Sequence, residues 1–223
     1  MTVSPYGPHA VLLRFADEPG EDALRRRLAL IADIERHPPP GLIEYVPGFV
    51  TLLLRFGPSQ PQQIARAGGE ILERLASAVP KHLPDGPIKT IPVVYDGEDL
   101  TTLADAKALS PPDVVRLHSA PIYHVQLIGF SPGFPYLGEL DPILHTPRRA
   151  TPRVRVAAGS VAIGGEHTGI YSVDSPGGWH IIGRTHVRMF DEACAATAAA
   201  PADAFFLRPG DRVRFVPVEA TQA

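Results

Sequence analysis

Cysteine is almost absent from this chain, because Cys194 is the single thiol among its 223 residues. One cysteine excludes an internal disulfide framework and a zinc site built from several thiolates. No histidine stands near Cys194 in the sequence to activate it, so we expect a packing residue rather than a nucleophile. A chain that needs no disulfide suits a reducing compartment, and we therefore expect the cytoplasm.

Long apolar runs and an excess of basic residues are missing as well. No segment approaches the roughly 20 apolar residues of a membrane-spanning helix. Residues 1–15 lack the basic and apolar regions of a signal peptide. The formal net charge of −3 gives no general attraction to nucleic acid or to an anionic membrane, so we expect neither as a partner.

Motifs for nucleotide binding and metal ligation are absent too. The chain has no G-x-x-x-x-G-K-[ST] loop and no G-x-G-x-x-G between a strand and a helix. Its nine histidines show no H-E-x-x-H spacing, so we expect no metal site. The three lysines, Lys81, Lys89 and Lys107, all precede the glycine-rich part of the chain, which excludes lysine-based chemistry there.

The first part of the chain carries an ordinary pattern for a small α+β domain. We expect strands over residues 10–15, 42–46 and 49–56, and helices over residues 21–36 and 59–79. This order is typical of a split βαβ, ferredoxin-like fold, in which both helices cover one face of an antiparallel sheet. The run Arg25, Arg26 and Arg27 is interpreted as a solvated helix face, since consecutive helical residues point in different directions.

A linker separates this part from a second domain. Residues 80–87 combine three prolines with an Asp-Gly pair, which opposes regular structure, so we expect domains over 1–84 and 85–223. We then expect a strand over 88–95, a helix over 99–109, and a helix that begins at Ser110. From Tyr123 onward short strands and turns predominate, which predicts a mainly β domain that closes into a barrel.

Glycines concentrate in this second domain, between Gly129 and Arg184, where they alternate with aromatic and basic side chains. Glycine permits positive φ and lets a ligand approach the main chain closely, so the pattern fits either a binding site or tight hairpins. The pair Pro132-Gly133 predicts a type II turn that directs Phe134 and Tyr136 outward on one face. The two rings either form a wall for a flat ligand or close one end of the barrel.

Four arginines fall within residues 147–155, where prolines oppose a helix. The planar guanidinium group pairs bidentately with carboxylate or phosphate, so Arg148, Arg149 and Arg153 are candidate anion-binding groups. The alternative is a basic loop exposed to solvent with no ligand.

Two further turns contribute candidates. Residues 176–178 predict a nest of backbone N–H groups beneath Trp179, with the hydroxyl of Ser175 as a further donor. The alternative is a tight hairpin packed by the indole. Gly164-Gly165 predicts a hairpin, and its return strand begins at Glu166 and His167, whose opposite directions argue against a catalytic dyad. The candidate binding residues are Phe134, Tyr136, Arg148, Arg149, Arg153, His167, Thr168, Ser175, Trp179, His180 and Arg184.

Five segments, taken in order, resemble allophanate hydrolase subunit 1: GFSPGFPYLG, TPRRATPRVRVAAGS, IGGEHTGIY, SPGGWHIIGRT and RPGDRVRF. This family includes the B subunit of prokaryotic 5-oxoprolinase and the kinase inhibitor KipI. The resemblance covers nearly all of residues 88–218 and, more loosely, the first domain. It implies a cyclophilin-like β-barrel behind a smaller α/β domain.

The resemblance also implies a function and partners. It implies a subunit of an ATP-dependent 5-oxoprolinase complex that opens 5-oxoproline to L-glutamate, with this chain inactive alone. The implied partners are an allophanate hydrolase subunit 2-like protein, which is the C component, and a LamB/YcsF-type protein, which is the A component. ATP, with magnesium, acts in the complex, and we expect this chain alone to bind neither. The alternatives are a KipI-type protein that inhibits a sensor histidine kinase by binding alone, allophanate hydrolysis, and prolyl isomerase activity.

Overall fold

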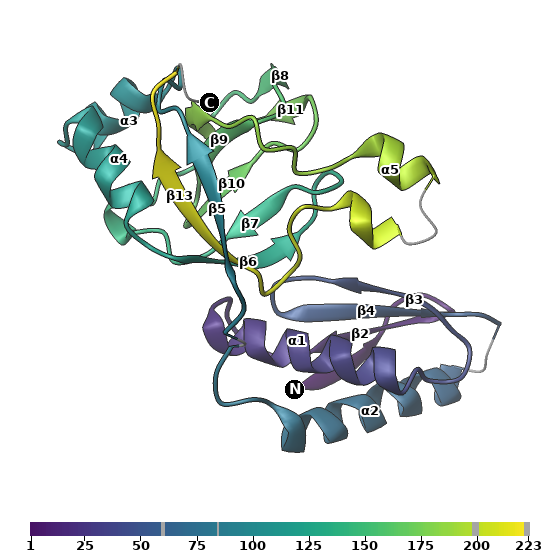
Figure 1. Ribbon diagram of the computed structural model, residues 1–223. Helices are drawn as coiled ribbons and strands as arrows, with labels where there is room; N and C mark the ends of the chain where they lie inside the picture. The colour runs from purple at the N-terminus through teal and green to yellow at the C-terminus, as the bar shows by residue number, and fades with distance from the viewer. Residues whose placement is uncertain (59–60, 84, 198–200, 221–223) are drawn as a thin grey trace. The chain divides into compact units, whose positions relative to one another are not determined.

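The protein is described by a computed structural model that covers residues 1–58, 61–83, 85–197 and 201–220 (Figure 1). The chain divides into two compact units, Met1–Asp85 and Gly86–Ala223, each with its own hydrophobic core. Among the described residues, no helix has both the length and the apolar character needed to cross a membrane.

The first unit is an antiparallel sheet with two helices on one face (Figure 1). Its elements are β1 Thr2–Pro5, β2 Ala10–Arg14, α1 Glu21–Arg36, β3 Leu42–Pro47, β4 Thr51–Phe56 and α2 Pro61–Ala78. The predicted β-α-β-β-α order runs from β2 to α2. The sequence did not predict β1, a short, largely exposed edge strand that pairs with β2, so the sheet order is β1-β2-β4-β3.

Three adjacent arginines of α1 have different surroundings. Arg25 and Arg26 both form ion pairs with Asp22. Arg25 is half-buried, and its Nη1 also donates to the carbonyl oxygens of Pro80 and Lys81 at 3.0 and 2.7 Å. Arg27 is fully buried, and its Nη1 donates to the carbonyl oxygens of Gly48 and Phe49 at 3.1 and 3.0 Å. The solvated interpretation is therefore wrong for Arg27, because its position on α1 faces the loop between β3 and β4. Burial lowers the pKa of Arg27 to about 10.

The second unit is a mixed sheet that curls into a nearly closed barrel, with α3 and α4 packed against it (Figure 1). Its strands run in the order β12-β9-β10-β7-β6-β13-β5, and only β5 and β13 pair in parallel. Val94 and Arg184 exchange two backbone hydrogen bonds of 2.9 and 2.8 Å, which link the two edges of the sheet. The bounds are β5 Ile88–Val93, α3 Leu100–Ala106, α4 Pro111–Ser119, β6 Tyr123–Ile128, β7 Pro135–Leu137, β9 Ser160–Gly164, β10 His167–Ile170, β12 His180–Arg184 and β13 Arg212–Pro217.

Smaller elements complete this unit. A separate two-stranded sheet pairs β8 Arg153–Val156 with β11 Ser175–Gly177. The remaining elements are the 3-10 turns Pro142–Leu144 and Pro201–Ala204 and the helix α5 Glu192–Thr197, so the alanine-rich segment is partly helical.

Local signals in the sequence predict two boundaries of this unit well. A capping box at Ser110 starts α4, where the Ser110 hydroxyl accepts from the backbone N–H of Asp113. The predicted hairpin joins β9 to β10, and because His167 lies opposite Gly164, its turn consists of Gly165 and Glu166. Gly165 has a φ of 66°, a conformation that favours glycine.

A fully buried histidine joins α4 to the barrel. The hydroxyl of Thr168 donates to the carbonyl of Ala162 at 3.0 Å, so it accepts from Nε2–H of His118 at 2.8 Å. Nδ1 of His118 then accepts from the hydroxyl of Tyr95 at 2.7 Å. Both ring nitrogens are satisfied in the neutral tautomer, and burial lowers the pKa of His118 to about 3.

This histidine makes stability depend on pH. The folded chain keeps His118 neutral while the unfolded chain protonates it below about pH 6.5, so acid favours unfolding. We expect the free energy of unfolding to fall as the pH is lowered from about 6 to 4. The slope should be about 1.4 kcal/mol per pH unit steeper in the wild type than in His118→Gln. Urea unfolding followed by fluorescence of Trp179, the only tryptophan, measures this unit specifically. Equal pH slopes in the two proteins would contradict the prediction.

Candidate functional site

A small aromatic pocket opens on the second unit. It encloses about 50 Å³, which is room for a few water molecules or one small functional group. Turns and strand ends from four stretches of the chain build it: the β6–β7 turn with β7, the loop before β8, the residue after β10, and the β11–β12 turn. The lining residues are Phe130, Phe134, Tyr136, Arg148, Tyr171, Gly177, Gly178 and Trp179.

Phe134 lies at the centre of the aromatic rings. Its ring centroid is 5.1 Å from that of Tyr136 and 5.3 Å from those of Tyr171 and Trp179, always edge to face. The predicted turn forms, with Gly133 at a φ of 79°. The outward direction predicted for Phe134 is wrong, because its side chain packs into a cluster with Val156 and Trp179 and is 2% exposed. Tyr136 is half-buried beside it, so the two rings do share one wall.

Several glycines of this region lie directly beneath aromatic rings, where a side chain would collide with the ring. A Cβ at Gly164 would lie 2.5 Å from the indole of Trp179, and a Cβ at Gly177 would overlap the hydroxyl of Tyr171. The rings therefore lie directly on main chain that carries no side chain. This is a third explanation for the glycine content, beside hairpin turns and approach of a ligand.

The expected anion-binding nest at residues 176–178 does not form. Neither Gly177 nor Gly178 has a positive φ, and Ser175–Gly177 is the strand β11, paired with β8. The extended backbone does not converge its N–H groups on one point. The Ser175 hydroxyl oxygen is buried without a hydrogen-bond partner, and Ser175 does not line the pocket.

A buried carboxylate binds two of the candidate arginines. Oδ1 of Asp99 accepts from Nη1 of Arg149 at 2.9 Å and from Nη2 of Arg153 at 2.8 Å, and Arg153 also pairs with Glu98. Oδ2 of Asp99 accepts from the backbone N–H of Ile181 at 2.7 Å. Burial alone raises the pKa of Asp99, but the hydrogen bonds from Arg153 and Ile181 and the charges of both arginines outweigh it and lower that pKa below its ordinary value.

Arg148 lines the pocket, and its side chain is exposed. Its guanidinium carbon lies 6.0 Å from the ring centroid of Trp179, and within the described part of the chain no carboxylate pairs with it. Burial raises the pKa of Tyr136 and of Tyr171, and the positive charge of Arg148 opposes that rise at both phenols. Arg148 thus acts electrostatically on the rings that surround it.

The other candidates do not line the pocket. Thr168 is buried in the barrel beside His118, and Arg184 pairs with Asp96 at the surface. His180 bonds the carbonyl oxygen of Pro147 through Nε2 at 3.0 Å. His167 is half-buried near Tyr136, with ring centroids 6.1 Å apart, and burial lowers its pKa. The structure therefore brings together Phe134, Tyr136, Arg148 and Trp179, and adds Phe130 and Tyr171, which sequence reasoning missed.

Comparisons with known proteins identify relatives. A family model described as carboxyltransferase domain, subdomain C and D, matches residues 1–200. The 5-oxoprolinase B subunit of Bacillus subtilis is 34% identical over 228 residues, which cover 96% of this chain and 91% of that protein. The 5-oxoprolinase B subunit of Escherichia coli O157:H7 is 44% identical over 183 residues, or 80% of this chain and 79% of that protein.

A solved structure shares the architecture. The crystal structure of TTHA0988 superimposes with a TM-score of 0.77 at 41% identity. The alignment covers 95% of this chain and 40% of that one, so this chain spans about two fifths of TTHA0988.

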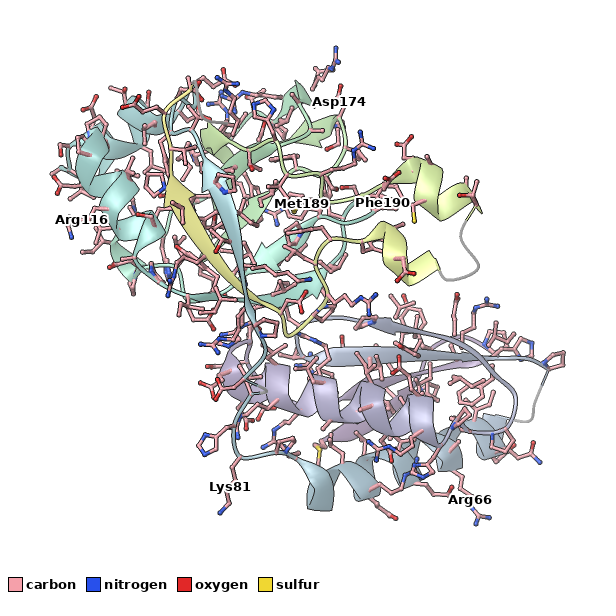
Figure 2. All side chains as sticks on the ribbon, viewed as in Figure 1. Arg66, Lys81, Arg116, Asp174, Met189 and Phe190 are labelled. Atoms are coloured by element: carbon pink, nitrogen blue, oxygen red, sulfur yellow. The ribbon has the colours of Figure 1, made fainter. Side chains whose placement is uncertain are left out.

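The Asp99 contacts predict a large loss of stability in Asp99→Asn. Removing the carboxylate charge leaves two guanidinium groups beside a neutral amide, and we expect a loss of about 3 kcal/mol, the lower end for a broken buried pair because the Arg149 side chain is 36% exposed. The matched control is Asp174→Asn, at a residue labelled in Figure 2. This change breaks the exposed Arg155–Asp174 pair and is expected to change unfolding little. Urea unfolding measures both, and similar losses would refute the buried role of Asp99.

Adjacent glycines offer a second paired test. Gly177→Ala places a methyl group against Tyr171, and overpacking of this kind costs about 1–3 kcal/mol. Gly178→Ala meets its nearest atoms at 3.7 Å and is expected to be neutral or slightly stabilising. Thermal unfolding and near-ultraviolet circular dichroism compare the two. A Gly177→Ala protein as stable as Gly178→Ala would show that the ring does not lie on this glycine.

Proposed function

The chain belongs to the carboxyltransferase subdomain C and D family and groups with the 5-oxoprolinase B subunits, and from this premise we propose that it is one subunit of an enzyme complex that hydrolyses 5-oxoproline to L-glutamate. The observation that carries the proposal is the near full-length match to the Bacillus subtilis protein, which covers both units of this chain. The same relationship supports a hydrolase rather than an isolated binding protein.

We propose that the chain is inactive alone. The pocket is lined by aromatic rings, two glycines and one arginine, with no carboxylate, imidazole, thiol or amine among the described lining residues. Opening a lactam requires activation of water and of a resonance-stabilised carbonyl, for which general acids and bases are the usual groups. Burial raises the pKa of both lining tyrosines away from neutrality. The pocket is therefore suited to binding, and the reacting groups come from elsewhere.

ATP does not fit this pocket. Ligand sites for molecules of that size measure about 300–1,000 Å³, many times the volume available, and one arginine cannot balance a triphosphate. The described residues also form no cluster of three or more histidine, cysteine, aspartate or glutamate side chains that could hold a metal ion. We propose that ATP and its magnesium bind elsewhere in the complex.

The proposed partners are an allophanate hydrolase subunit 2-like protein and a LamB/YcsF-type protein. The relatives carry the name of a B subunit, which supports an assembly of several chains. This chain matches 40% of TTHA0988, so the rest of that longer chain lies outside the match, which supports a partner for this chain. The single cysteine supports the cytoplasm as the compartment. A protein that only binds and inhibits a histidine kinase is less well supported, because such a role does not require a pocket lined by Arg148 without an acidic partner among the described residues.

We also propose a ferredoxin-like fold for the first unit and a cyclophilin-like fold for the second. The split order of β2, β4 and β3 with α1 and α2 on one face supports a ferredoxin-like first unit, with β1 as an added edge strand. The barrel of the second unit supports the cyclophilin-like assignment.

Omission of single components tests the function. We expect this chain, co-expressed with its two proposed partners, to release glutamate from 5-oxoproline in an ATP-dependent reaction. The rate is expected to fall at least 100-fold when this chain is left out, because its pocket supplies binding that the partners lack. A coupled glutamate dehydrogenase assay measures the rate, and adding the purified chain back is the control. Turnover that does not need this chain would end the proposal.

A further inference from the structure

The arginines of residues 147–155 differ in what balances their charge. Arg149 and Arg153 share the carboxylate of Asp99, and Arg155 pairs with Asp174 at the surface. Arg148 is the exception, since within the described part of the chain no acidic side chain pairs with it. Glu98 also pairs with Arg153, so three carboxylates face the four guanidinium groups of residues 147–155. The one positive charge left without an acidic partner among the described residues lies beside the aromatic pocket.

The backbone next to Arg148 is held by its neighbour, while the side chain of Arg148 itself is exposed. The next residue, Arg149, donates its backbone N–H to the carbonyl of Gly178 at 2.7 Å, while its side chain reaches Asp99. The guanidinium carbon of Arg148 lies 6.0 Å from the ring centroid of Trp179. The lining rings of Trp179 and Phe134 are 5% and 2% exposed, whereas Arg148 is exposed, so an anion at its guanidinium would be shielded from solvent on the side of the rings. Electrostatic attraction is stronger in such surroundings than in water.

The chemistry of the pocket selects one kind of anion. A single guanidinium balances one negative charge, and its planar fork matches the two oxygens of a carboxylate. A phosphate dianion would need further donors, but the nearby backbone of Ser175–Gly177 is extended and forms no nest. A volume of about 50 Å³ admits a carboxylate group and the atoms next to it, not a nucleotide.

We propose that this pocket binds the carboxylate of a small molecule, with Arg148 as its counter-charge and the rings of Tyr136 and Trp179 as its walls. The identity of that molecule as 5-oxoproline rests on the proposed function, whereas binding of a carboxylate does not. The lactam ring of 5-oxoproline then extends from the pocket mouth, where the groups that open it must be supplied by a partner protein.

Fluorescence of Trp179 provides the first test on the full chain alone. We expect 5-oxoproline to change the emission in a saturable way, and 2-pyrrolidinone, the same lactam without the carboxylate, to bind at least tenfold more weakly. Arg148→Gln is expected to weaken 5-oxoproline binding at least tenfold and to leave 2-pyrrolidinone unchanged. The matched control is Arg155→Gln, which removes a nearby arginine outside the pocket and is expected to bind like the wild type. Equal affinity of Arg148→Gln and the wild type for 5-oxoproline would overturn the proposal.

The reconstituted complex provides the second test, which decides the matter if the chain alone gives no signal. An Arg148→Gln complex that assembles normally and shows a KM for 5-oxoproline raised at least tenfold supports the proposal, and an unchanged KM overturns it. Loss of assembly by size-exclusion chromatography also overturns it, because Arg148 would then pair with an acidic side chain of a partner. Saturable carboxylate binding in a protein that fails the omission test would refute the proposed function and leave this site standing.

Discussion

The buried carboxylate of Asp99 is the contact on which the geometry of the pocket depends. It precedes α3, yet its oxygens bind the side chains of Arg149 and Arg153 and the N–H of Ile181, which lie 50 to 82 residues further along the chain. Two guanidinium groups at this spacing would repel each other and attract any anion that approached. Asp99 binds both, and Glu98 adds a second negative charge at Arg153, so these arginines are held against the barrel. Among the four arginines of residues 147–155, Arg148 alone has no acidic partner within the described part of the chain.

The aromatic rings depend on a different constraint, the absence of side chains beneath them. Trp179 lies against Gly164 and Gly169, and Tyr171 lies against Gly177, where a methyl group would already collide. Close contact of flat rings with bare main chain leaves little room for rearrangement, since cores of this density transmit any added volume as strain. The close packing of the rings on glycine main chain thus restricts the walls of the pocket, and Arg148 gives the pocket its charge. These two properties come from different parts of the sequence.

Local patterns in the sequence were sufficient for much of the fold. The start of α4 at Ser110 and the hairpin at Gly165 follow from capping and turn chemistry within a few residues, and both are observed. The burial of Arg27 and the inward direction of Phe134 were not predictable in this way, because each depends on which distant segment packs against it. The same limit applies to the four arginines of residues 147–155, which are similar in sequence although the last two lie in β8. Only the position of Asp99 in the folded chain separates Arg148 from Arg149 and Arg153.

The rim of the pocket indicates where a partner would act. Phe130 is 62% exposed and has a φ of 69°, so a large apolar side chain is held in water in a backbone conformation that non-glycine residues rarely adopt. Its ring nevertheless packs edge to face against Phe134 and Tyr171, so it forms part of the pocket wall. A rigid pocket that holds one end of a substrate and contains no acid or base needs a second surface to close over the other end. An exposed aromatic ring at the mouth gives such a surface an apolar contact, and closure there would also remove the water that weakens the charge of Arg148.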